Sequence, residues 1–468
     1  MPADIRFFRL IWIILLTGLL LRLAFSLSQP TYSTFDTARG GDTGWYLANG
    51  YGFFSGEKHG WVEKMPFYIE RIPTPPLYIL YAGFFQQVLS RHETILAMRL
   101  LQCLASMATV YLAFRLSLLI SRDRRVASLI TFLAAFHPAF VVEPANIATE
   151  TLYVFFLALG FWIYLNYVVN ALFLQCTYKV GPQAAIILTA MAFALATLTR
   201  AVAVLFPFVI VLHLLLLGRR QLSTVWRRLS VLLIVVYALV VATWTIYNIV
   251  LWGRLVIVSD QLLPALWRGA VTQDGSPAQN DALLLQDSEV NSNDDCHPDC
   301  KYQHPPELYL EQIGESVEDD IAGFIARRLK ELSFSLIQPH GTAEFGGASI
   351  REAAGELLRQ NRSLEGIITV LQLEGFALKG VVWIIHLGGM ALGLLGMWHS
   401  RGNLWLTFPL VGFVLYTIVA HLFLLALPRY MFPLEVVWLI FAGISAVKLY
   451  DHWRGRANES SSVSLEAG

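Results

Sequence analysis

The sequence predicts an all-α polytopic membrane protein, and three observations carry this prediction. Of the 468 residues, 56% are hydrophobic and only 15% are charged, whereas soluble domains carry roughly a quarter charged residues. Apolar runs long enough to cross a bilayer recur along the chain. Arginines gather in several links between these runs, as they do in cytoplasmic loops. A formal net charge of zero gives no basic excess for binding nucleic acid.

The first apolar run, Leu10–Leu27, has Arg22 as its only charged residue and follows Arg6 and Arg9. This positive flank predicts a cytoplasmic N-terminus. A cleavable signal peptide is the alternative interpretation. The arginine within the run and the lack of a clear small-residue cleavage site disfavour it.

The next run, Pro76–Leu89, is only marginally long enough to cross a bilayer. The arginine-rich link Ser121–Arg125 further on is predicted to be cytoplasmic. Successive spans must alternate between the two sides of the membrane. Only one crossing, Ala97–Ile120, can therefore lie between the outer side and that link. We expect Pro76–Leu89 to lie at the interface or to insert halfway, so that residues 29–96 form one long outer loop with helices on the membrane.

The later runs are predicted to cross in turn. The link 218–228 contains four arginines, which fixes it as cytoplasmic. We therefore predict ten spans, with both chain termini in the cytoplasm. The nine spans after Leu10–Leu27 are Ala97–Ile120, Val126–Val142, Thr151–Val169, Ala184–Thr199, Ala201–Leu217, Leu229–Leu251, Ala377–Trp398, Leu404–Leu427 and Met431–Leu449.

Composition divides the chain into four regions: an N-terminal transmembrane module (1–252), a polar outer loop (253–375), the last transmembrane helices (376–450) and a cytoplasmic tail (451–468). Within the polar loop, apolar residues recur at helical spacing and predict one amphipathic helix over the membrane face, Pro306–Leu336. Its apolar positions are Ile313, Val317, Ile321, Phe324, Ile325, Leu329 and Leu332. We expect a loop here, not an independent domain.

Candidate chemistry begins in the polar, aromatic stretch 41–76. Asp42 and Tyr46 are four residues apart, on one face of a helix, and Gly40-Gly41 allow a sharp turn before them. A carboxylate there can accept a proton from a hydroxyl group, although an Asp at this place can equally cap a helix. Asp36 is the weaker substitute, because it lacks the glycine pair and the tyrosine.

Glu150 lies at the outer mouth of a predicted span. It can orient an acceptor or hold a metal ion beside Asp42, or it can simply stabilise a helix N-terminus. Glu143 is its alternative.

Arg200 and Arg429 occupy outer turns between apolar runs. They can form a phosphate clamp, because a guanidinium group binds phosphate oxygens in a bidentate way, or they can reach lipid headgroups. Lys64 and Arg71 can join such a clamp.

The segment Cys296–His304 contains metal-like residue types, but its spacing matches no strong zinc motif. A disulfide between Cys296 and Cys300 is at least as good an interpretation. We therefore assign no metal ligands, and a divalent cation stays open as a cofactor. Cys103 and Cys176 are expected to be small core residues; His386 and His421 are expected to be packed helix residues.

The order of these landmarks resembles GT-C class membrane glycosyltransferases, particularly the family of protein O-mannosyltransferases and lipid A aminoarabinose transferases. The similarity covers both ends of the chain. Two departures are Tyr247 before Asn248, where the family often has Arg, and the short C-terminus, which leaves acceptor recognition to the outer loops. The matching residues are Arg22, Gly41-Asp42, Tyr46, Ala48, Gly52-Phe53, Glu70-Arg71, Pro75-Pro76-Leu77-Tyr78, Arg99-Leu100-Leu101-Gln102, Pro138, Thr149-Glu150, Leu198-Thr199-Arg200, Trp244, Asn248, Gly253, Arg429-Tyr430 and Pro433.

This resemblance implies the GT-C fold and an inverting transfer of a hexose or pentose from a polyprenyl-phosphate donor to a hydroxyl group of a lipid, glycan or protein, at the extracytoplasmic face of a bacterial inner or plasma membrane. Asp42 would be the general base and Glu150 the second acidic residue of the cavity. The residues implied in substrate binding are Tyr46, Lys64, Glu70, Arg71, Arg200, Arg429 and Tyr430.

Two other classes of function stay open. A transporter or flippase of lipid-linked sugars would use the same cations and aromatic residues, and a non-catalytic assembly subunit would leave Asp42 and Glu150 far apart. Long outer loops that carry carboxylates favour the enzyme, whereas paired broken helices at mid-membrane would favour transport. The sequence leaves open the sugar, the acceptor, the prenyl chain length, metal dependence and the oligomeric state.

Overall fold

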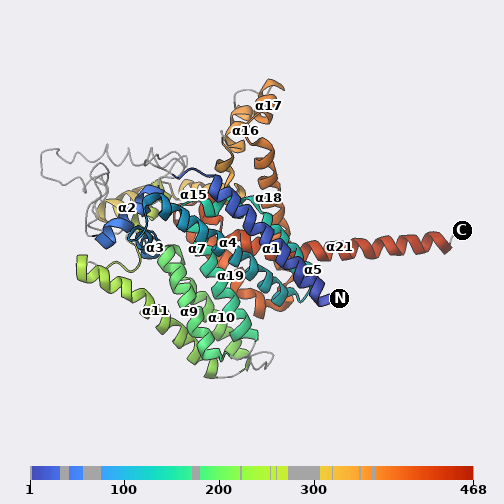
Figure 1. Ribbon diagram of the computed structural model, residues 1–468, viewed down its shortest axis with the longest axis horizontal. Helices are drawn as coiled ribbons and strands as arrows, with labels where there is room; N and C mark the ends of the chain where they lie inside the picture. The colour runs from blue at the N-terminus through green and yellow to red at the C-terminus, as the bar shows by residue number, and fades with distance from the viewer. Residues whose placement is uncertain are drawn as a thin grey trace.

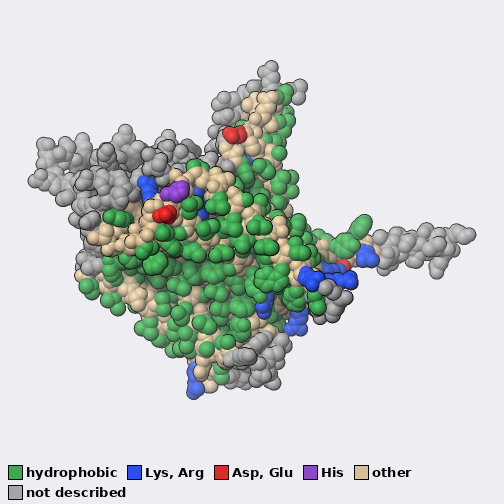
Figure 2. All heavy atoms as spheres, in the orientation of Figure 1, with side chains coloured by type: hydrophobic (Ala, Val, Ile, Leu, Met, Phe, Trp, Pro, Cys, Tyr) green, Lys and Arg blue, Asp and Glu red, His purple; other side chains and the backbone are tan. Residues whose placement is uncertain are grey.

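The computed structural model describes residues 3–31, 42–55, 75–170, 180–221, 224–252, 255–259, 261–271, 306–318, 320–346, 349–359 and 364–466. Within these ranges all regular secondary structure is helical. The long helices form a bundle from which two parts project: α16 and α17 with the first half of α18, and the C-terminal half of α21 (Figure 1). On the face shown in Figure 2, hydrophobic side chains cover the middle of the bundle.

Eight helical segments are long and apolar enough to cross a membrane, by length and composition, among the residues described. Each coincides with a predicted span, so these eight predictions are confirmed. The segments lie in α1 (Ala3–Ser28), α4 (Arg91–Ser121), α7 (Glu150–Ile163) with the π-helical turn Tyr164–Val169, α9 (Pro182–Thr199), η5 (Ala201–Ala203) with α10 (Phe206–Gln221), α11 (Thr224–Trp252), α18 (Phe376–His399) and η8 (Arg401–Asn403) with α19 (Leu404–Phe423).

The predicted span Val126–Val142 corresponds to two helices, α5 (Arg124–Phe136) and α6 (Pro138–Val142), and the chain bends by 56° between them. Pro138 has no N–H group and keeps His137 out of the helical conformation. The bend frees two carbonyl groups of α5. Arg22 of the first span donates to both, at 2.7 Å from Ala135 O and 3.1 Å from Ala134 O, which explains how an arginine is tolerated within this apolar run.

With the bent pair, the described residues give up to nine spans instead of ten. The tenth predicted span falls in α21 (Leu434–Glu466), which carries Glu435, Lys448 and Asp451 along its apolar half. This part of α21 packs closely along α18, since a Cβ atom at Gly396 would lie only 2.0 Å from Phe441 O. The helix is therefore present, but its charges distinguish it from the other spans.

The predicted first outer loop (29–96) contains α2 (Asp42–Ser55) and α3 (Pro76–Gln86). The 11 residues of α3 are too few to cross a bilayer at about 1.5 Å per residue, which confirms that this run does not span. The two helices touch at Gly50 and Gly83, where an added Cβ atom on Gly83 would lie 2.3 Å from Gly50 O. The pair is thus held at a distance that only glycine allows.

The described residues of the predicted second outer loop (253–375) form six short helical segments. The single helix predicted over Pro306–Leu336 is wrong, because the first helix ends at Glu318 and Asp320 caps a new one by accepting a hydrogen bond from the Gly323 amide at 2.8 Å. The segments are α12 (Leu262–Val271), α14 (Pro306–Glu318), α15 (Ile321–Ile337), η7 (Thr342–Phe345), α16 (Ile350–Arg359) and α17 (Leu364–Leu371). The buried face of α15 packs on α19 and on α20 (Pro428–Met431).

Candidate active site

Two buried glutamates, Glu143 and Glu150, lie in the turn that joins α6 to α7. Both are less than 5% exposed. Side chains of α4 hold the backbone between them: Gln102 Nε2 donates to Pro144 O at 2.9 Å and to Asn146 O at 2.7 Å. Arg99 Nε donates to Ala145 O at 2.8 Å. Hydrogen bonds from α4 therefore fix the backbone of the turn that carries both glutamates, as a functional site requires.

Glu150 forms an ion pair with Arg200, whose Nη1 atom donates to Glu150 Oε1 at 2.6 Å. Arg200 follows α9 in an extended conformation, at the tight turn before the next span. Its guanidinium carbon lies 4.8 Å from the ring centre of Tyr430 and 5.7 Å from that of Tyr153, within the range of cation–π attraction. The pair is thus buried among aromatic faces.

A second arginine reaches the same tyrosine. Arg429, on α20, donates from Nη2 to the Tyr430 hydroxyl at 3.3 Å, and its guanidinium carbon lies 5.2 Å from the Tyr430 ring centre. Pro428 begins α20 and sets the direction of the chain at this turn. Arg200 and Arg429 therefore flank one ring and make a positively charged corner, which suits a phosphate group.

Glu143, the alternative to Glu150, has its own partner: His340 Nε2 lies 2.6 Å from Glu143 Oε2. His340 comes from the loop after α15, where Gly341 adopts a φ of +84° and lies against Val142. Burial acts to lower the pKa of His340, but the carboxylate of Glu143 outweighs it and raises the pKa above its usual value. His340 could not be predicted from the sequence, since a single histidine in a polar loop gives no signal of its partner.

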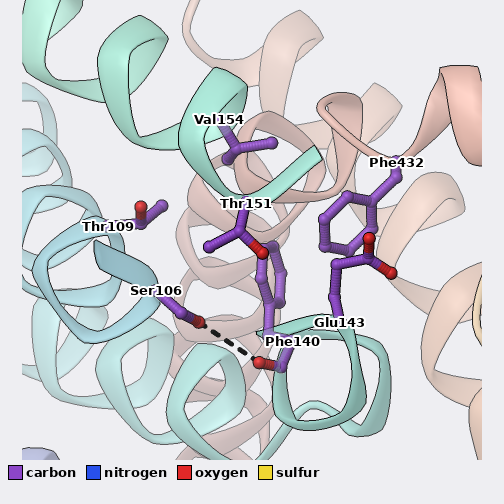
Figure 3. A pocket seen from close by; sticks show the side chains of 7 residues that line it. All are labelled: Ser106, Thr109, Phe140, Glu143, Thr151, Val154 and Phe432. Carbon is purple, nitrogen blue, oxygen red and sulfur yellow. Dashed lines mark hydrogen bonds between the residues drawn. The ribbon is translucent and has the colours of Figure 1, made fainter. Parts of the chain in front are cut away.

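A small cavity adjoins Glu143 (Figure 3). It has room for about one water molecule, roughly 10 Å³, and it is far too small for a sugar. In Figure 3 the Glu143 carboxyl group lies beside the Phe432 ring, and Ser106 Oγ donates to Phe140 O at 3.2 Å. The lining residues are Ser106, Thr109, Phe140, Glu143, Thr151, Val154 and Phe432.

The predicted base, Asp42, is the first residue of α2, and its side chain lies outside the described part of the structure. The neighbouring Thr43 hydroxyl reaches Ile147 O at 3.5 Å, so the start of α2 lies against the turn that carries the two glutamates. Tyr46, one turn later, packs its ring 4.7 Å from that of Tyr78.

The structure thus brings four of the predicted residues together: Glu150, Arg200, Arg429 and Tyr430. The other predictions in the two outer loops fall outside the described residues: Lys64, Glu70, Arg71, Cys296 and Cys300.

Cys176 also falls outside the described residues, whereas Cys103 is buried as expected. Among the residues described, no three His, Cys, Asp or Glu side chains are arranged to hold a metal ion. His421 is buried in α19 as predicted. His386 is buried too, but it bonds to Glu435 and lies 2.7 Å from Leu336 O, polar contacts that the sequence did not indicate.

Comparison of the sequence with curated proteins gives no significant match. Among solved structures, the chain is similar to the oligosaccharyltransferase AglB of Archaeoglobus fulgidus in complex with an inhibitory peptide and a dolichol-phosphate, with 14% identity and a TM-score of 0.49 over 96% of this chain and 52% of that one. It is also similar to the same archaeon's oligosaccharyltransferase tethered to an acceptor peptide, with 12% identity and a TM-score of 0.50 over 96% and 50%. The chain spans about half the length of these relatives.

The model of one protein family, described as dolichyl-phosphate-mannose-protein mannosyltransferase, matches residues 12–256. This match includes the bend at His137, Glu143, Glu150 and Arg200, and it covers slightly more than half of the chain. The match, the helical architecture and the carboxylate–arginine cluster agree with one another. The chain is a multi-pass membrane protein of the GT-C fold and belongs to the dolichyl-phosphate-mannose-protein mannosyltransferase family of glycosyltransferases.

Proposed function

We propose that this protein transfers a sugar from a polyprenyl-phosphate carrier to an acceptor hydroxyl group, with inversion at the anomeric carbon. The observation that supports this most is the pair of arginines around Tyr430, beside the buried Glu150. Such a corner can bind the phosphate of a donor whose prenyl chain lies in the membrane. The reaction takes place on the side opposite the arginine-rich links, which is the extracytoplasmic face of the bacterial inner or plasma membrane.

The proposed transfer step uses the charged residues of the site to stabilise the leaving phosphate and to remove a proton. The acceptor oxygen attacks the anomeric carbon while the bond from that carbon to the phosphate oxygen breaks, and the phosphate leaves with the electron pair. Arg200 and Arg429 stabilise the negative charge that develops on the departing phosphate. Glu150 holds Arg200 in the required orientation. Asp42 takes the proton of the attacking hydroxyl group, as a general base.

The donor's sugar and phosphate are held by further residues of the first outer loop in this proposal. Tyr46 lies one helical turn after Asp42 and offers an aromatic face. The remaining residues assigned to substrate binding are Lys64, Glu70 and Arg71. Hexosyl donors are the first to test, because the matched family is described by its mannosyl donor. The acceptor is a lipid, glycan or protein, and the membrane lipids surround the donor's prenyl chain.

The test follows release of a radiolabelled sugar from a panel of polyprenyl-phosphate donors, with a membrane-lipid and glycan extract as the source of acceptors. The purified protein in detergent is compared with Asp42→Asn. We expect release by the parent and a fall of roughly 10²–10⁴-fold in the variant, while the variant still folds and binds donor. Asp451→Asn, the same change at the opposite end of the bundle, is the matched control.

Two outcomes would contradict the proposal in different ways. If Asp36→Asn abolishes release and Asp42→Asn does not, the transferase stands but the base is misassigned. If the parent consumes no donor, while vesicles containing it move a lipid-linked sugar between leaflets with or without Asp42, the protein is a transporter and the enzyme proposal is wrong.

A further inference from the structure

The corner between α19 and α20 determines where Arg429 and Tyr430 lie. Helix α19 ends at Phe423, and Leu424 and Leu427 have extended conformations before α20 begins at Pro428. The last carbonyl groups of a helix have no partners within it. Here they must be satisfied by groups from another element, and that element sets the course of the corner.

The groups come from one side chain of the second outer loop, Arg328 on α15, which is only 2% exposed. Its Nε atom donates to Leu422 O at 3.0 Å, and its Nη2 atom donates to His421 O at 3.1 Å and also to Leu424 O. One guanidinium group therefore binds three carbonyls at the end of α19. Glu331, one turn further along α15, accepts a hydrogen bond from Arg328 Nη1 and balances its charge.

Helix α12 also contacts this corner. Gly269 O accepts a hydrogen bond from Arg328 Nη1 at 2.7 Å, and the Leu425 amide donates to Ala265 O at 3.2 Å. A Cβ atom at Gly269 would lie 2.7 Å from Phe423 O. The approach of α12 to the corner is therefore as close as glycine allows, and Arg328 joins the two helices to it.

We propose that Arg328 is a positioning residue for the transfer reaction: it fixes the α19–α20 corner and so holds Arg429 and Tyr430 beside the Arg200–Glu150 pair. The expected effect on donor KM rests on the proposed function. The expected effect on the position of the α19–α20 corner does not. Lysine cannot replace Arg328, because a single ammonium group lacks the planar fork of donors that reaches carbonyls in several directions.

The test compares Arg328→Lys with Arg327→Lys, the same change at the adjacent position. Arg327 is half-buried, and its Nη2 atom donates to the Ser316 hydroxyl at 3.3 Å. We expect Arg328→Lys to raise amide hydrogen exchange over residues 424–431 about tenfold above the control, with little change in α1 and α4. The KM for the polyprenyl-phosphate donor should rise about tenfold, with a smaller change in kcat. Global destabilisation would instead lower kcat and raise exchange throughout.

A double variant shows whether Arg328 acts through Arg429. In the background Arg429→Gln, the further change Arg328→Lys should have almost no effect on donor KM, because coupled residues are not additive. If Arg328→Lys does not fold, Gly269→Ala displaces the same corner without altering a charge and should raise donor KM and local exchange in the same way.

The inference is overturned if Arg328→Lys, or Gly269→Ala in its place, behaves like Arg327→Lys in both exchange and KM, or if its effect on KM is undiminished in Arg429→Gln. Failure of the proposed function gives a different result. In that case the parent consumes no donor, while exchange over residues 424–431 and binding of polyprenyl phosphate alone still separate Arg328→Lys from its control.

Discussion

Two arginine–carboxylate groups lie at opposite ends of the bundle and have nearly the same geometry. In the candidate active site, Arg200 lies 2.6 Å from Glu150, with side chains 13% and 5% exposed. At the predicted cytoplasmic end, Arg125 lies 2.7 Å from Asp451 and 2.8 Å from Asp123, with side chains 57%, 48% and 29% exposed. The distances are alike, and the surroundings are not.

The difference shows that burial, more than distance, decides what such a pair does. Exposed ion pairs contribute little, because water screens the charges and two long side chains lose freedom. A buried pair is different, because removal of one partner leaves an uncompensated charge away from water. The rings of Tyr153 and Tyr430 around Arg200 strengthen this contrast. Substitutions should therefore have large effects at the first group and small effects at the second.

The largest effect is expected for Glu150→Gln. This change leaves the buried Arg200 without its carboxylate, so the free energy of unfolding should fall by about 3–5 kcal/mol. Sugar release should fall at least about 100-fold, because the cation that stabilises the leaving phosphate is no longer oriented. Denaturant titration in detergent and the release assay measure the two effects. An unchanged unfolding midpoint would show that the pair is not the buried contact described here.

Arg200→Lys should have a smaller effect, because it keeps the charge and loses the planar group that lies over Tyr430 and Tyr153. We expect donor binding to weaken by about 0.5–2 kcal/mol, with unfolding less affected than in Glu150→Gln. Equilibrium binding of a polyprenyl-phosphate sugar measures this. Tyr430→Leu is the matching change on the ring side, and equal donor affinity in the parent and both variants would exclude a role for this contact.

His340→Gln tests the second carboxylate pair through pH. Because Glu143 raises the pKa of His340 above its ordinary value of about 6.5, the imidazolium–carboxylate attraction stabilises the fold fully below that pH and is lost as pH rises through the raised pKa. The melting temperature of the parent should therefore approach that of His340→Gln as pH rises from about 6.5 through the raised pKa of His340. A difference that widens toward alkaline pH would contradict this sign.

The smallest effect is expected for Arg125→Gln and Asp451→Asn. Both side chains are largely exposed, so the melting temperature and sugar release should stay within the scatter of the parent's values. If either variant loses as much stability as Glu150→Gln, burial is not what distinguishes the two groups.

Much of the fold follows from local properties of the chain. The length of an apolar run decides whether it can cross a bilayer, and a cluster of arginines marks the side on which a link lies. For this reason eight spans and the short, non-crossing α3 were predicted from the sequence. The two breaks were missed. Pro138 and Asp320 are local signals, but a proline can also be tolerated within a transmembrane helix, as Pro409 is within α19.

The candidate site divides in the same way. Glu150, Arg200 and Arg429 could be proposed from the sequence, because titratable groups that gather beside apolar spans are candidates for chemistry, and Tyr430 could be proposed from the family resemblance. Which groups pair with one another could not be proposed, and neither could His340 or Arg328. Glu143 and His340 are 197 residues apart, and Arg328 is 94 residues from Leu422, whose carbonyl it binds.

The sequence alone therefore determined the membrane class, the order of the spans and the charged residues at their ends, because hydrophobicity, helix length and charge placement act over a few turns of chain. Only the tertiary structure decided which carboxylate pairs with which cation, where the helices bend, and that α15 reaches across to the corner that carries Arg429. These choices depend on which carbonyls, rings and charges are buried together, and burial belongs to the packed fold and not to any one segment.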